Sequence, residues 1–170
     1  DRDPSGTVYH VHEVRQKENI IMEKILIVDD SIVQASQLKS ILEAEYDITI
    51  AQTPEEGLSR ASNEDYSLIL LDVVMPGMDG FTLLKKLQEE IVTQNIPVIL
   101  ITSLSDVTSE QRGLILGAVD YITKPFNPLI VKARVNTHIK LYNYRKQVEW
   151  QSMTDQMTGI ANRRRYDGYS

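Results

Sequence analysis

The stretch LILLDVVMPGMDG, residues Leu68–Gly80, joins four apolar residues to a carboxylate and then to a turn. The apolar run predicts a buried strand, and Asp72 stands where that strand ends. The letters MPGMDG contain a proline and two glycines, which cannot continue a central strand. The stretch therefore predicts an ionisable group at the rim of an apolar core, where other groups must neutralise its charge.

Short apolar runs alternate with helical patterns on both sides of this stretch. The expected strands are 24–28, 47–51, 67–71, 97–101 and 118–122, and the expected helices are 31–45, 54–62, 79–91, 106–116 and a last helix from Asn127. Apolar strands separated by helices predict a parallel sheet that is covered on both faces. We therefore expect an α/β fold, a flavodoxin-like doubly wound five-stranded parallel sheet of order 2-1-3-4-5 with an extended C-terminal helix.

The composition fits a folded domain with appendages. The chain has 170 residues, of which 42% are hydrophobic and 25% charged, and it has no cysteine. The lack of cysteine excludes disulfides, thiol nucleophiles and cysteine-rich zinc sites. No apolar run reaches the ~18 residues of a membrane span, and residues 1–21 lack the apolar region of a signal peptide. We expect a cytoplasmic protein without a membrane partner.

Charge divides the chain into a body and an extension. Residues 1–131 carry 10 basic and 21 acidic residues, a net charge of −11, whereas residues 132–170 carry 8 basic and 3 acidic residues, a net charge of +5. The basic end contains no recognisable DNA-reading motif. We therefore interpret it as a solvated helix face and expect no nucleic-acid partner.

The strand ends carry the candidate chemistry. In a doubly wound sheet the site lies beyond the carboxyl ends of the strands. Asp29 and Asp30 follow the first strand, Asp72 ends the third, Thr102 follows the fourth, and Lys124 comes after the fifth. An aspartate in such a place often caps a helix or forms a turn. Together, however, these residues put three carboxylates, a hydroxyl and an ammonium at one rim.

Three carboxylates at one rim repel each other unless a divalent cation shares them. A site made of oxygen ligands suits Mg²⁺, which usually works with a phosphoryl group. A carboxylate beside such a metal can attack phosphorus, while Lys124 and Thr102 would bind the phosphoryl oxygens. These residues therefore predict phosphoryl transfer to Asp72.

The spacing of these residues resembles that of receiver domains of two-component response regulators. Asp72 with MPGMDG is similar to the family pattern D-x-x-M-P-x-M-D-G, and Thr102, Tyr121 and Lys124 lie 30, 49 and 52 residues beyond Asp72. The resemblance implies that Asp72 accepts a phosphoryl group from a histidine kinase or a phosphotransfer protein. It also implies that Lys124 pairs with the phosphoryl oxygens, that Thr102 moves to bond them, and that Tyr121 swings inward as a switch.

The same resemblance assigns the metal ligands. It implies that Mg²⁺ is held by Asp29, Asp30, Asp72 and the backbone carbonyl of Val74. It further implies a cis bond before Pro125, as X–Pro bonds permit. Gly80 would relieve backbone crowding after the site loop.

Two apolar positions bear on how long the phosphoryl group survives. In the family the residues two after the phosphoacceptor and two after the threonine line the approach of water, and here they are Val74 and Leu104. Neither side chain can orient an attacking water by hydrogen bonding. We therefore expect slow intrinsic loss of the phosphoryl group.

The last helix continues beyond the length that a receiver domain needs. Ile130, Leu141, Tyr144 and Val148 fall on one stripe, interrupted by Arg134 and Thr137. The stripe predicts either a protruding helix with a short coiled coil or a plain amphipathic terminal helix. The family resemblance suggests a homodimer formed through residues 106–130 and this helix.

The final segment, TDQMTGIANRRRYDGYS, resembles the start of GGDEF domains, the diguanylate cyclases, which opens close to D-x-L-T-G-L-x-N-R-R. The matching residues are Asp155, Thr158, Gly159, Asn162, Arg163 and Arg164. The resemblance implies a cyclase output whose nucleotide site and metal ligands lie beyond Ser170. We expect this polypeptide alone to make no cyclic di-GMP, and to catalyse nothing beyond its own phosphorylation and dephosphorylation.

The expected organisation has four parts: a flexible leader or tag at 1–21, a receiver domain at 22–140, a helical stalk at 141–154 and the start of a GGDEF domain at 155–170. One alternative is a stand-alone receiver that acts by binding a protein partner. Another is a haloacid-dehalogenase-like phosphatase, but that family needs a second aspartate where Val74 stands. A flavodoxin is disfavoured because the acidic loop after Val28 would repel the phosphate of its cofactor.

Overall fold

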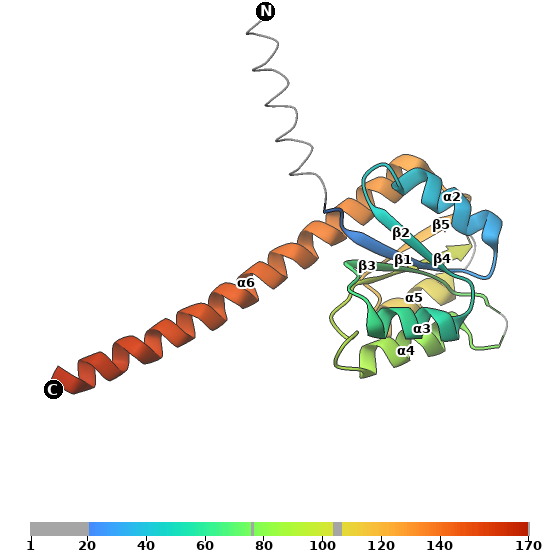
Figure 1. Cartoon of the computed structure of the whole chain (residues 1–170). Helices are drawn as coiled ribbons and strands as arrows, with labels where there is room; N and C mark the ends of the chain where they lie inside the picture. Colours follow the sequence, from blue (N-terminus) through green and yellow to red (C-terminus); the bar gives the residue numbers. More distant parts are fainter. Residues whose placement is uncertain (1–20, 76, 104–106, 170) are drawn as a thin grey trace, which may run out of the picture.

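The computed structural model describes residues 21–75, 77–103 and 107–169, with side chains described as far as Asp155. Strands and helices alternate along these residues (Figure 1). In chain order the elements are β1 (Lys24–Val28), α2 (Ile32–Leu42), β2 (Asp47–Ala51), α3 (Pro54–Asn63), β3 (Leu68–Asp72), α4 (Gly80–Glu89), β4 (Val98–Ser103), α5 (Val107–Ile115), β5 (Asp120–Lys124) and α6 (Pro128–Tyr169).

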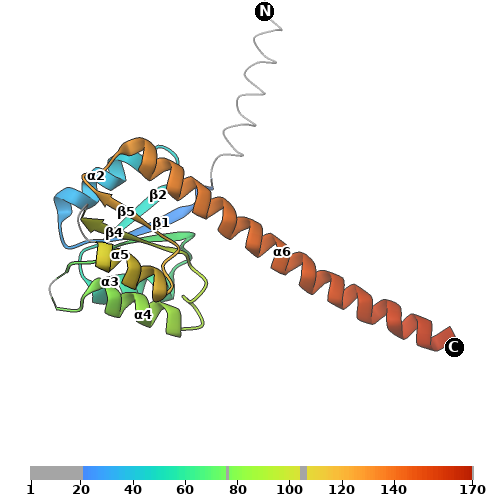
Figure 2. The ribbon, with the colours of Figure 1, turned by 180° about the vertical axis from the view of Figure 1, so that it is seen from behind.

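The sheet has the topology that the sequence predicts. Its five strands run in the order β2-β1-β3-β4-β5, and all four neighbouring pairs are parallel. Helices α3, α4 and α5 cover one face, and α2 with the first part of α6 covers the other (Figures 1 and 2). The predicted doubly wound α/β fold is confirmed, and the order of the strands places a switch point between β1 and β3.

Two apolar clusters explain why the strands are apolar throughout. Along β1, Ile25 and Ile27 belong to the cluster that includes α2 and α6. Leu26 and Val28 belong to the cluster on the opposite face. Because successive side chains of a strand point to opposite faces, a strand that is buried on both faces needs apolar residues at every position.

The fifth strand lies two residues further along the chain than the sequence predicted. It spans Asp120–Lys124 rather than 118–122, because the chain from Gly117 to Ala118 still bonds back to α5 and closes its end. Gly117 has a φ of 111°, a left-handed conformation that suits glycine after a helix. Lys124 is therefore the last residue of the strand rather than the residue after a loop.

The prediction for α2 was wrong at its end and at one position of its stripe. The helix ends at Leu42, three residues early, because the N–H groups of Glu45 and Tyr46 both bond to the Leu42 carbonyl and form a turn. Ile32, expected on the buried stripe, is 50% exposed at the first position of the helix. The other element boundaries agree with the predictions to within one or two residues.

Helix α6 has a packed part and a protruding part. Val131, Val135 and Ile139 are buried against the sheet. From residue 144 to 155 every described side chain of the helix is exposed, and the end of α6 extends away from the body (Figures 1 and 2). With 42 residues it is about 60 Å long. Among the described residues, neither this helix nor any other has an apolar stretch long enough to cross a bilayer.

Candidate functional site

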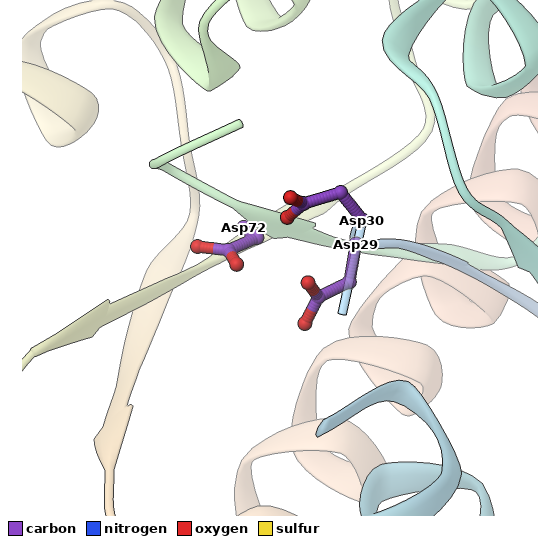
Figure 3. Close-up of side chains that lie close together, drawn as sticks. All are labelled: Asp29, Asp30 and Asp72. Carbon is purple, nitrogen blue, oxygen red and sulfur yellow. The ribbon is translucent and has the colours of Figure 1, made fainter. Parts of the chain in front are cut away.

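Three carboxylates meet at the carboxyl ends of β1 and β3. The register pairs Val28 with Leu71, so Asp29, directly after β1, lies level with Asp72, the last residue of β3. Oxygens of Asp29, Asp30 and Asp72 lie within 4.8 Å of one another (Figure 3). The acidic cluster that the sequence predicts at this edge of the sheet is thus assembled from the first and third strands.

Asp29 is the most deeply buried member of the cluster. It is 1% exposed; its Oδ1 accepts the N–H of Ser31 at 2.9 Å, and its Oδ2 is buried with no hydrogen-bond partner among the described residues. The pKa of Asp29 is raised from its ordinary 3.8 to about 7, chiefly by burial; the negative charge of Asp72 also raises this pKa, whereas the Ser31 N–H and Lys124 lower it. A bound divalent cation would supply the missing partner and remove this penalty. The donor set, all carboxylate oxygens, fits Mg²⁺.

Asp72 is buried and contacts a cation from two strands away. Its side chain is 4% exposed, and Oδ1 accepts the N–H of Val74 at 3.1 Å. The Lys124 Nζ lies 3.5 Å from both carboxylate oxygens. This distance exceeds that of a short charge-assisted hydrogen bond, so the contact is mainly electrostatic. Asp72 is therefore held in place, and an ammonium lies near its oxygens.

Gly80 allows the chain to fold back beneath Asp72. Its N–H donates to the Val73 carbonyl at 3.0 Å. A Cβ at Gly80 would lie 2.5 Å from the Asp72 carbonyl oxygen and 2.8 Å from the Val73 Cα, distances that side chains do not tolerate. Asp79 then caps α4 by accepting the Thr82 N–H at 2.8 Å. This sharp return supports the expectation that glycine relieves crowding after the site loop.

Thr102 and Tyr121 lie on the neighbouring strands β4 and β5. Thr102 is 2% exposed and its Oγ1 lies 3.4 Å from Oε2 of Glu110 on α5. Tyr121 is partly buried against the cluster beneath α3 and α4. The structure thus brings Asp29, Asp30, Asp72 and Lys124 into one site, with Thr102 on the strand between β3 and β5.

Two contacts of these residues were not predicted from the sequence. Glu110 gave no signal, because a glutamate in the first turn of a helix is common. Arg134 interrupted the apolar stripe of the last helix, yet its guanidinium lies over the Tyr121 ring. The Val74 side chain is 73% exposed beside the site, while Leu104 lies outside the described residues. The bond between Lys124 and Pro125 is cis, as the resemblance implied.

Comparison with known proteins agrees with this geometry. The profile of the family described as response regulator receiver domain matches residues 25–136. The chain belongs to this family of receiver domains. Members interact with histidine kinases or phosphotransfer proteins, and the acidic cluster described above lies within the matched range.

The curated relatives are much longer than the region that matches this chain. The response regulator PleD of Caulobacter vibrioides is 41% identical over 115 residues, which are 67% of this chain and 25% of PleD. A protein of Vibrio cholerae named as a probable cyclic di-GMP phosphodiesterase is 37% identical over 123 residues, 72% of this chain and 28% of that protein. The chain thus spans about a quarter of the length of these curated relatives.

A solved structure supports the fold independently. The receiver domain protein of Methanospirillum hungatei JF-1, described as CheY-like, superposes with a TM-score of 0.68 at 31% identity. The match covers 74% of this chain and 99% of that structure. The protruding part of α6 is therefore additional to a complete receiver fold.

Proposed function

We propose that Asp72 is the phosphoacceptor of this receiver domain. The observation that carries the proposal is the convergence of three carboxylates within 4.8 Å, with the Lys124 ammonium 3.5 Å from Asp72. The donor is a histidine kinase or a phosphotransfer protein. An Asp72 oxygen attacks phosphorus in line as the bond from phosphorus to the donor imidazole breaks, and the electron pair of that bond stays on the imidazole nitrogen.

The surrounding residues position the reaction. Lys124 neutralises the equatorial phosphoryl oxygens, and the Val74 N–H fixes the orientation of the Asp72 carboxylate. Asp29, Asp30, Asp72 and the Val74 carbonyl would hold Mg²⁺, which supplies charge neutralisation and orientation at the phosphoryl group. Thr102 then turns from Glu110 towards the new phosphoryl oxygens, and Tyr121 follows as the switch.

The proposed output is a diguanylate cyclase domain that continues after the chain. Its support is the resemblance of residues 155–170 to the start of GGDEF domains, together with a relative that is named as a probable cyclic di-GMP phosphodiesterase. Helix α6 runs without a break through the proposed stalk, 141–154, and on to Tyr169. A continuous helix would transmit a change in the receiver to a following domain as a rigid element.

The proposed assembly is a homodimer that forms through residues 106–130 and α6. Exposed apolar side chains lie on both parts: Val107, Leu114, Ile115, Leu129, Ile130, Leu141, Tyr144 and Val148. A helix of this length that extends alone with apolar residues exposed is suited to pairing with a second copy. Pairing would bring two output domains together.

Labelling with a small phosphodonor tests the phosphoacceptor. We expect intact-mass spectrometry to show one added phosphoryl group after treatment with acetyl phosphate and Mg²⁺. The Asp72→Asn chain should gain none, and Lys124→Ala should be labelled more slowly. The matched control is Asp65→Asn, which removes a carboxylate at the opposite end of the sheet. Equal labelling of Asp72→Asn and the unaltered chain would show that another residue is the acceptor.

A further inference from the structure

Arg134 of α6 contacts both the side chain and the backbone of Tyr121. Its Cζ lies 5.4 Å from the centroid of the tyrosine ring, within the range of cation–π attraction. Its Nη1 donates a hydrogen bond to the Tyr121 carbonyl oxygen. The residue proposed as the switch is thus held by the helix that leads out of the domain.

The backbone contact covers an open edge of the sheet. β5 is an edge strand of the sheet formed by the described residues, so one side of its backbone pairs with no strand among them and needs other partners. At Tyr121 the N–H donates to Oδ1 of Asp120 at 2.8 Å and the carbonyl accepts from Arg134. Arg134 Nη1 also lies 3.8 Å from Asp120 Oδ1. One ion pair therefore satisfies both backbone groups of the residue.

Asp120 also contacts α6 one turn further along the helix. Its Oδ2 lies 3.0 Å from Nε2 of His138, four residues after Arg134. Residues four apart lie on the same face of a helix. The two side chains fix α6 against the start of β5, and only Arg134 also reaches the Tyr121 ring.

We infer that Arg134 is a positioning residue: it holds the Tyr121 ring in the orientation seen here and couples a change of that orientation to α6. The inference rests on the proposed function, in which Tyr121 moves when Asp72 carries a phosphoryl group. A movement of the ring breaks the cation–π contact, whereas the bond to the carbonyl can persist. The cation–π contact with the ring is therefore the contact that opposes the proposed movement of Tyr121.

The expected effect is measurable as the affinity for beryllofluoride with Mg²⁺, a mimic of the phosphoryl group. A cation–π contact at a partly exposed site changes an equilibrium about two- to fivefold. Arg134→Gln should therefore bind the mimic about two- to fivefold more tightly. In a Tyr121→Ala background the same substitution should change nothing, because the ring is gone. His138→Gln is the matched control, since it replaces the other α6 partner of Asp120 without touching the ring.

A spectroscopic signal reports the ring directly. In protein labelled with 3-fluorotyrosine, the ¹⁹F resonance of Tyr121, assigned with Tyr121→Phe, should shift in Arg134→Gln and stay in place in His138→Gln. Arg134→Lys keeps a cation and should give smaller changes of the same sign, which preserves the test if Arg134→Gln does not fold.

The binding results distinguish a failure of this inference from a failure of the proposed function. If the unaltered chain binds no beryllofluoride with Mg²⁺, the phosphoacceptor proposal is wrong, and the inference is wrong with it. If the unaltered chain binds the mimic but Arg134→Gln has the same effect with and without the Tyr121 ring, only the inference is overturned. Tighter binding that depends on the ring, together with the ¹⁹F shift, supports it.

Discussion

At the scale of single residues, the site contains buried carboxylates, and burial disfavours their negative charge. One oxygen of Asp29 is buried and has no hydrogen-bond partner within the described part of the chain, and the Asp72 carboxylate lies beside it. The folded chain therefore binds a proton at Asp29 more tightly than the unfolded chain does, and a cation at the site would replace that proton. Stability and metal binding are thus linked through one side chain.

We predict that metal-free protein loses stability as the pH rises because of Asp29. Its folded pKa of about 7 lies above the ordinary 3.8, so this contribution is complete below about pH 4 and is lost as the pH rises towards and through about 7. Urea unfolding without Mg²⁺ should show that Asp29→Asn removes about 1–3 kcal/mol of this pH dependence. Added Mg²⁺ should stabilise the unaltered chain most at the alkaline end. A pH profile that Asp29→Asn leaves unchanged would contradict the prediction.

A second residue-scale prediction concerns the lifetime of the phosphoryl group. Val74 is exposed beside the site and cannot orient a water. We expect the phosphorylated chain to decay over minutes or longer, and the Val74→Asn, Leu104→Glu double variant to decay faster, because both new side chains bond water. The measurement is the loss of the labelled species over time after removal of the donor. Decay within seconds, or a double variant that decays no faster, would show that these positions do not control hydrolysis.

At the scale of elements, α6 is fastened to the sheet at the end opposite the site. The Glu23 carboxylate before β1 accepts hydrogen bonds from Ser67, before β3, and from Asn143 Nδ2 at 2.9 Å. From residue 144 onward the described side chains of α6 are exposed, so Asn143 lies at the start of the protruding part. These contacts therefore fix the direction in which the protruding part begins.

Removing the Asn143 amide should loosen the start of the protruding helix. We expect Asn143→Ala to lower the free energy of unfolding by about 0.5–1.5 kcal/mol, the usual net value of one hydrogen bond. Amide hydrogen exchange should become faster in the turns that follow position 143. Gln147→Ala is the matched control, because Gln147 is exposed on the same helix. Equal protection in the two variants would mean that the bond does not hold the helix.

Local sequence patterns predicted most strands and helices but not the contacts between them. The strands at 24–28 and 47–51 were predicted to the residue, and the carboxylates of the site followed from their places at strand ends. The start of β5 was predicted two residues early, because the chain at Gly117 still closes the end of α5. The pattern of apolar residues does not reveal this closure. The partners Glu110, Glu23 and Arg134 were missed, because such contacts depend on how elements pack rather than on spacing along one element.

At the scale of the whole molecule, the body and the protruding helix differ in charge and in packing. The body is acidic and the last residues are basic. From residue 144 to 155 the side chains of α6 are exposed, and the end of the helix extends away from the body (Figure 1). A receiver fold is complete without this part, because a solved receiver domain matches over 99% of its own length. The protruding helix therefore has a separate task, which we propose is to join two copies and their output domains.

The dimer proposal predicts a change of mass on activation. Light scattering should show the mass of the chain rising towards that of a dimer with beryllofluoride and Mg²⁺, and no response in Asp72→Asn. Leu141→Lys with Val148→Lys should weaken pairing without changing the affinity for the mimic, since both side chains are exposed and far from the site. An unchanged mass in the presence of bound mimic would remove this model for the chain.

If Asp72 itself carries the phosphoryl group, chemical location of the modified residue will show this most directly. Borohydride reduces an acyl phosphate on aspartate to homoserine, which peptide mass spectrometry can assign to one position. After treatment with acetyl phosphate and Mg²⁺, we predict homoserine at position 72 alone. Reduction at position 29 or 30, or at no aspartate although the chain is labelled, would contradict the account.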